Sequence, residues 1–205
     1  MGAVKVIINK ELKVAFNSLL IYIAYTAFLG VTGFVCWFSG KNIFSSGQAS
    51  LSNLFNVFYW TLFFLIPALT MKSISEERKE GTFELLFSKP IKTGQVIMGK
   101  FLAILLQVVI CLALTLPYYI TIASLGNVDH AVGFCGYLGL ILVSGCYISI
   151  GMFASSLTPN TIVAFFITFA IETGFVLLFE FIAELWGSGF MAALFTYLSI
   201  GEHFD

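Results

Sequence analysis

The stretch MKSISEERKEGTFELLFSKPIKTGQVIMGK, residues 71–100, interrupts a chain that is apolar over most of its length. Six of the ten Lys and Arg residues fall in it, together with four of the eleven acids. Apolar runs long enough to enter a bilayer flank it at 54–69 and 101–116. A charge-dense segment between two spans must lie in water, and its excess of cations predicts that it faces the cytoplasm.

The composition excludes a soluble globular protein. The 205 residues are 59% hydrophobic and 10% charged, with a mean hydropathy of +0.98, whereas soluble domains carry about 25% charged residues. A net charge of −1 gives no indication of nucleic-acid binding. The four cysteines lie in apolar runs, and His130 and His203 are isolated, so the sequence predicts no metal site.

The apolar runs predict an all-α, polytopic helical bundle. We expect five transmembrane helices, near 18–39, 54–71, 96–124, 133–157 and 161–183. The transmembrane domain is therefore 18–183, with a cytoplasmic segment at 72–95. Residues 184–205 predict a short hydrophobic helix or hairpin at the outer face, because their apolar part is about half of the length that crosses a bilayer. The bilayer is thus one expected partner.

Residues 1–17 predict an amphipathic helix on the cytoplasmic interface. Apolar residues recur there at helical spacing, namely Val4, Ile7, Ile8, Leu12, Ala15 and Phe16. The charged residues Lys5, Lys10, Glu11 and Lys13 are expected on other faces. This segment and the 71–100 stretch hold nine cations, against one in the loops predicted outside, so we expect a cytoplasmic N-terminus.

Within the charged stretch, turn and capping signals predict two short helices. Ser73 and Glu76 have the spacing of a capping box, and Gly81 is expected to break the first helix. Thr82 can begin a second helix, which would place Phe83, Leu86 and Phe87 on one side and Glu84 on another. Such an apolar surface with a charged rim suits a protein groove, and it equally suits the membrane headgroups. Farther on, Pro117 predicts a kink in the third span.

The stretch EERKEGTFELLFSKPI, followed by GQVIMGKFLAILL, resembles the type 2 ABC transporter permeases. In that family an E-E-[basic]-x-x-G-T-[apolar]-E-L-L motif follows the second span, and a Gly-Lys pair opens the third. The matching positions are Glu76, Glu77, Arg78, Gly81, Thr82, Glu84, Leu85, Leu86, Pro90, Gly99 and Lys100. The ELK at 11–13 is similar to the family's N-terminal interfacial helix. The resemblance is closest to gliding-motility-associated permease subunits and the related nitrous-oxide-reductase maturation permeases.

The resemblance implies a non-catalytic exporter subunit of the bacterial inner (plasma) membrane. Such a subunit pairs with a second copy or a sister permease and docks cytoplasmic ABC ATPase subunits through the helix around Thr82 to Phe87, which includes Phe83 and Glu84. ATP and Mg²⁺ are then bound by the ATPase, and this chain holds no cofactor. Because the family normally has six spans, the resemblance also implies that the sixth is missing here.

Two further features of the sequence bear on possible chemistry. Residues 94–100 have G-x-x-x-x-G-K spacing, but Phe101 replaces the hydroxyl that would bind Mg²⁺, so we do not predict a nucleotide site. Glu172 lies about twelve residues into the fifth predicted span, where an ionisable group costs about 3 kcal/mol. It is either a structural group held by a neighbouring hydroxyl, or the centre of a stand-alone ion or proton-coupled carrier or channel, which is the alternative function.

Overall fold

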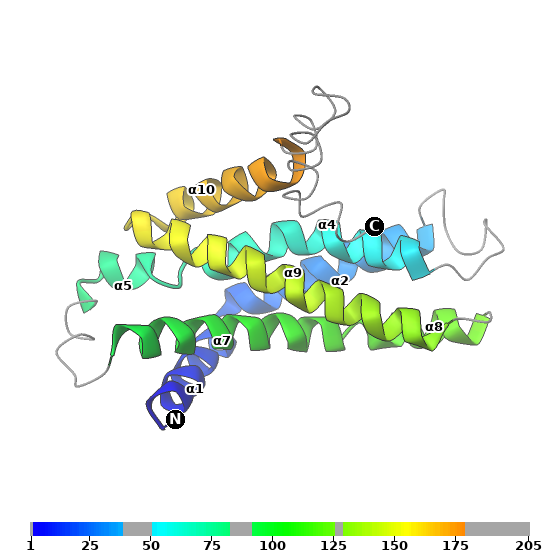
Figure 1. Ribbon diagram of the computed structural model, residues 1–205, viewed down its shortest axis with the longest axis horizontal. Helices are drawn as coiled ribbons and strands as arrows, with labels where there is room; N and C mark the ends of the chain where they lie inside the picture. Colours follow the sequence, from blue (N-terminus) through cyan, green and yellow to red (C-terminus); the bar gives the residue numbers. More distant parts are fainter. Residues whose placement is uncertain (1, 39–50, 83–91, 126–128, 179–205) are drawn as a thin grey trace, which may run out of the picture.

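The computed structural model describes residues 2–38, 51–82, 92–125 and 129–178, and within these ranges the chain is helical without strands. The helices are α1 (Gly2–Phe16), α2 (Leu19–Phe38), α4 (Leu51–Thr70), α5 (Ser75–Lys79), α7 (Thr93–Ala113), α8 (Leu116–Leu125), α9 (His130–Leu157) and α10 (Thr161–Thr173), and a π-helical turn η1 (Gly174–Leu178) follows. Figure 1 shows α4, α7, α8 and α9 running lengthwise, with α1 at one end.

Four of the five predicted spans are confirmed as helices of sufficient length and apolarity. Among the described residues these are Leu19–Phe38, Leu54–Lys79, Thr93–Leu125 and His130–Leu157. The fifth predicted span, 161–183, is seen as the 13-residue helix α10 continued by η1. Its last residues and the predicted outer segment 184–205 lie outside the described residues, so the count of five spans stays a prediction.

Helix α4 is the centre of the bundle. It contacts α2, α7, α9 and α10, and residues such as Phe58 and Ile66 are fully buried. Its contact with α9 is especially close, because a Cβ atom on Gly151 would lie 2.2 Å from Oγ1 of Thr70. Spans in lipid associate through such close packing of small residues rather than through the hydrophobic effect.

The third span is interrupted just before Pro117, where the sequence predicts a kink. Pro117 has no N–H to donate, and the chain passes from α7 to α8 just before it. Thr115 N–H turns back to the carbonyl of Leu112 (3.0 Å), and Tyr118 N–H donates to the carbonyl of Thr115 (2.9 Å). Tight turns of this kind satisfy the backbone where the α-helical ladder stops, so the third span consists of two helical pieces.

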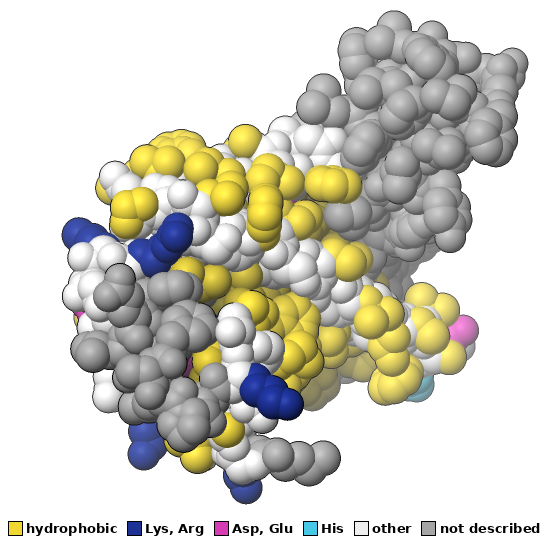
Figure 2. Space-filling view, turned by 60° about the vertical axis from the view of Figure 1, so that its left-hand side comes forward, with side chains coloured by type: hydrophobic (Ala, Val, Ile, Leu, Met, Phe, Trp, Pro, Cys, Tyr) yellow, Lys and Arg dark blue, Asp and Glu magenta, His cyan; other side chains and the backbone are white. Residues whose placement is uncertain are grey.

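Apolar side chains cover much of the outer surface, whereas the cations gather at one end (Figure 2). Every described Lys and Arg lies in α1, between α4 and α7, or in the first turns of α7. The N-terminal helix and the charged segment are therefore on the same side of the bundle. Large exposed apolar surfaces are rare on soluble proteins, and here they suit contact with lipid.

Candidate coupling site

The charged segment after α4 folds into α5, and the N-terminus of α5 is capped from another helix. The hydroxyl of Ser155, near the end of α9, accepts hydrogen bonds from the backbone N–H groups of Ile74 (3.1 Å) and Ser75 (3.0 Å). The first N–H groups of a helix have no partner within it, so α9 supplies the missing acceptor. The Arg78 guanidinium donates to the carbonyl of Ser156, which makes a second link between α5 and α9.

The predicted capping box of Ser73 and Glu76 is wrong. The N-cap residue is Ile74, and it makes no side-chain capping bond. The Ser73 hydroxyl is buried without a hydrogen-bond partner in the described part of the chain, while Glu76 pairs with Lys72 at 3.5 Å. The physical reason is that the Ser73 N–H, from which Glu76 would have accepted a hydrogen bond, donates instead to the carbonyl of Thr70 (2.9 Å), while Ser155 accepts from the next two N–H groups.

The break at Gly81 is confirmed. Helix α5 ends at Lys79, and Gly81 has a φ of +68°, the left-handed conformation that glycine adopts without strain. The hydroxyl of Thr82 then donates to the carbonyl of Glu77 (3.3 Å). The remaining predicted docking residues lie outside the described residues, so the second helix stays a prediction; they are Phe83, Glu84, Leu85, Leu86 and Phe87.

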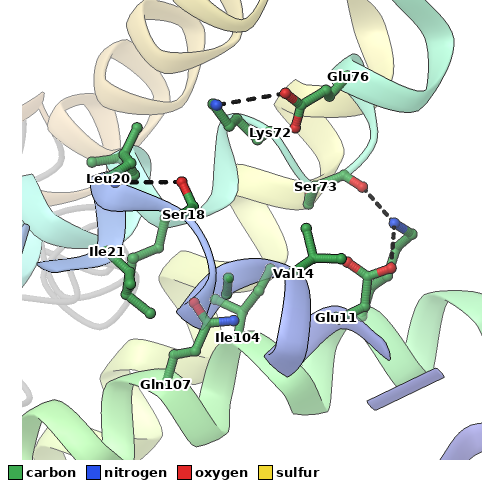
Figure 3. A pocket seen from close by; sticks show the side chains of 14 residues that line it. Glu11, Val14, Ser18, Leu20, Ile21, Lys72, Ser73, Glu76, Ile104 and Gln107 are labelled. Atoms are coloured by element: carbon green, nitrogen blue, oxygen red, sulfur yellow. Dashed lines mark hydrogen bonds and ion pairs between the residues drawn. The ribbon is translucent and has the colours of Figure 1, made fainter. Parts of the chain in front are cut away.

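Lys100 is the centre of an ion network that joins four parts of the chain. Its side chain is only 4% exposed. Its Nζ lies 2.9 Å from Oε1 of Glu77 and 3.3 Å from Oε1 of Glu11, and it donates to the carbonyl of Ser73 at 2.7 Å. The dashed lines at Glu11 and Ser73 in Figure 3 mark two of these contacts. Lys10 approaches the same two carboxylates at 3.4 and 3.2 Å. The network thus links α7, α5, α1 and the connection between α4 and α5.

The electrostatics of this network are balanced, with two lysines and two glutamates. A buried cation is stabilised only when charges and hydrogen bonds replace its lost water, and Lys100 has both. Burial alone would lower the pKa of Lys10, but the carboxylates of Glu11 and Glu77 outweigh this effect and raise it. We call Lys10, Glu11, Glu77 and Lys100 the Lys100 network.

The predicted placement of Glu11 on a face away from the apolar side of the N-terminal helix is wrong. Glu11 follows Ile7 by four residues, so both lie on one face of α1, and this face packs on α7. A Cβ atom on Gly99 would lie 2.6 Å from Cγ2 of Ile7, so Gly99 permits the close contact. The neighbouring Lys100 then meets Glu11. Residues 94–100 form the first turns of α7.

Glu172 lies apart from the Lys100 network, in α10. It is fully buried, and neither carboxyl oxygen has a hydrogen-bond partner among the residues that the structure describes. The hydrogen bond to a neighbouring hydroxyl that the sequence suggested is therefore not formed there. The Tyr147 hydroxyl on α9 is near enough to interact with it electrostatically. Over the described ranges, no cluster of His, Cys, Asp or Glu could hold a metal ion.

The comparison with known families agrees with this arrangement. Residues 6–201 match the family described as ABC-2 family transporter protein. The chain belongs to this family. Its membrane subunits work with an ATPase partner, and together with the apolar helices the membership makes the chain a multi-pass membrane protein. The ABC-2 resemblance of the 76–100 stretch is thus confirmed. No curated protein and no solved structure matches the chain.

Proposed function

We propose that this chain is the permease subunit of an ABC exporter and that α5, with the residues after it, docks a separate cytoplasmic ATPase. Lys79, Glu80 and Thr82 are exposed at the charged end of the molecule, whereas the opposite side of α5 is bound to the bundle. A docking element needs one free side for its partner and one side attached to the spans, and α5 has both.

The observation that carries the proposal is the burial of Lys100 between α5, α1 and α7. A displacement of α5 can be transmitted to α7 through the contact of Glu77 with Lys100, and from Lys100 to α1 through Glu11. It can be transmitted to α9 through the hydrogen bonds of α5 with Ser155. Charge-assisted hydrogen bonds are short and about twice as strong as neutral ones. The four elements can therefore move together when the ATPase closes on its nucleotide.

Further parts of the proposal follow from this role. The N-terminus and α5 face the cytoplasm of a bacterial inner membrane, and two permease copies, or one copy and a sister permease, share two ATPase subunits. ATP and Mg²⁺ are held by the ATPase. The resemblance to gliding-motility-associated subunits favours a transporter that acts on the cell envelope.

Cysteine cross-linking tests the docking. Cys135 and Cys146 are exposed and are first replaced by serine, after which Thr82→Cys is introduced. We expect a bifunctional maleimide to join this cysteine to the co-expressed cognate ATPase. The matched control is Ala131→Cys, which is exposed at the far end of the bundle, and it should give no product.

The same two variants test the topology. In right-side-out vesicles, a membrane-impermeant maleimide should label Ala131→Cys and leave Thr82→Cys unlabelled until the membrane is opened. Labelling of Thr82→Cys from outside would place α5 on the wrong side for any cytoplasmic ATPase and would overturn the proposed function.

A further inference from the structure

A cavity of about 230 Å³ lies beside the Lys100 network, between the corner where α1 meets α2, the end of α4 and the first turns of α7 (Figure 3). Half of its lining residues are apolar, with Ile21, Leu69 and Ile104 among them. Its polar lining comes from Glu11, Ser18, Lys72, Ser73, Glu76, Lys100 and Gln107. The cavity therefore combines both signs of charge with an apolar wall.

One polar side chain in this cavity is available to a ligand. Gln107 is 5% exposed, lines the cavity, and directs its amide from α7 toward the α1–α2 corner in Figure 3. The amide makes no hydrogen bond within the described residues. A ligand with donors and acceptors of its own could therefore bond to it.

A separate apolar groove of about 270 Å³ lies next to the cavity, between α2 and α4. Ala68 lines both spaces, which makes them neighbours. The groove is lined by Ala24, Ala27, Phe28, Val31, Thr61, Phe64, Leu65 and Ala68. Its one hydroxyl, that of Thr61, is already bonded to the carbonyl of Val57. Each space alone is slightly smaller than the roughly 300–1,000 Å³ of typical ligand sites.

The order of these features along the helices matches an amphiphile. The charged groups lie at the water-facing end, and Gln107 is seven residues, or about 10 Å, farther along α7. The apolar groove extends along α2 and α4 from there. Lys72 and Glu76, which pair with each other at 3.5 Å and are exposed, offer a cation and an anion at the mouth. A headgroup that carries one positive and one negative charge complements this set better than a purely anionic one.

We propose that the cavity and groove bind one zwitterionic phospholipid, of the phosphoethanolamine type, from the leaflet on the α5 side. Its phosphate accepts hydrogen bonds from Lys72 and Gln107, and its ammonium group faces Glu76, so that the headgroup replaces the exposed Lys72–Glu76 pair. One acyl chain fills the groove between α2 and α4. This site does not depend on the docking of an ATPase.

Photo-cross-linking of the full chain in lipid nanodiscs tests the site, with a phosphatidylethanolamine that carries a diazirine on its acyl chain. Ala27→Phe fills the groove from an exposed position, so it should not disturb the core. We expect it to lower cross-linking to α2 and α4 about tenfold. The matched control, Ile23→Phe, lies one turn earlier outside the groove lining and should leave the yield unchanged. Gln107→Leu should lower the yield about fivefold, as expected for one lost hydrogen bond.

Equal yields from Ala27→Phe and Ile23→Phe would overturn the proposal, as would cross-links spread evenly over the exposed face of α9. Competition separates headgroups: unlabelled phosphatidylethanolamine should displace the probe, and equal displacement by phosphatidylglycerol would refute the zwitterionic assignment. If Ala27→Phe instead dissociates a dimer without any specific lipid product, the groove is a contact between two copies and the lipid site is wrong.

Discussion

Replacing Lys100 by Met removes the buried ammonium group and keeps most of the side chain's apolar length. Glu77, whose side chain is 16% exposed, then loses its closest cation, and Glu11, 20% exposed, loses one of its two cations. The Ser73 carbonyl loses a donor. Removing one partner of a buried ion pair costs about 3–5 kcal/mol. Because Lys10 still lies near both carboxylates, we expect a loss of about 2–3 kcal/mol in the free energy of unfolding.

Equilibrium unfolding of the purified chain in mixed micelles measures this loss. The matched control is Lys13→Met on α1, because Lys13 is exposed and makes no ion pair within the described residues; surface changes of this kind stay within about 0.5 kcal/mol. A double-mutant cycle with Glu77→Gln isolates the pair. Residues in one ion network should show a coupling energy of about 1 kcal/mol or more.

Two results would refute the reasoning. If Lys100→Met and Lys13→Met have the same stability, the Lys100 network does not hold α1, α5 and α7 together. If the losses in free energy of unfolding caused by Lys100→Met and Glu77→Gln simply add in the double variant, the 2.9 Å contact between these two side chains does not stabilise the protein.

Three other predictions concern single contacts. Gly99→Ala should destabilise the chain by about 1–2 kcal/mol, because overlap with Ile7 outweighs the gain in helix propensity, and in an Ile7→Ala background the same change should become stabilising. Ser155→Ala should cost about 1 kcal/mol and reduce stimulation of the ATPase, since α5 loses its cap. Glu172→Leu should raise the unfolding midpoint, because it removes two buried oxygens that lack partners among the described residues.

A different result would contradict each of these three predictions. Destabilisation by Gly99→Ala even without the Ile7 side chain would mean that α1 does not press on this position. If Ser155→Ala stimulates the ATPase as fully as the exposed control Ser149→Ala does, the cap on α5 is not needed for coupling to the ATPase. A lower midpoint for Glu172→Leu, measured beside Glu172→Gln, would show that the carboxyl group has a stabilising partner.

The spans and breaks could be predicted from the sequence because they depend on local chemistry. Four apolar runs become helices since only intrachain hydrogen bonding satisfies a backbone in lipid. Gly81 and Pro117 interrupt helices through properties of their own residue types. The periodicity of the first helix also placed Ile7 correctly on its inward face.

The connections within the candidate site could not be predicted, because they join residues far apart in the chain. Lys100 and Glu11 are separated by 89 positions, and Ser155 and Ser75 by 80. The spacing of Ser73 and Glu76 predicted a local capping box, but the N-terminus of α5 is capped by Ser155 of α9 instead. The ABC-2 resemblance identified Lys100 as a motif position, but it did not indicate what the ammonium group would contact.

The cap on α5 has a consequence for biogenesis. A helix of five residues is too short to persist alone in water, and its acceptor belongs to a span that emerges 80 residues later during synthesis. Until α9 is inserted beside α4, α5 in a newly made chain therefore lacks this cap and is less ordered. An ATPase subunit that binds α5 would therefore bind fully inserted permease subunits in preference to partly inserted ones.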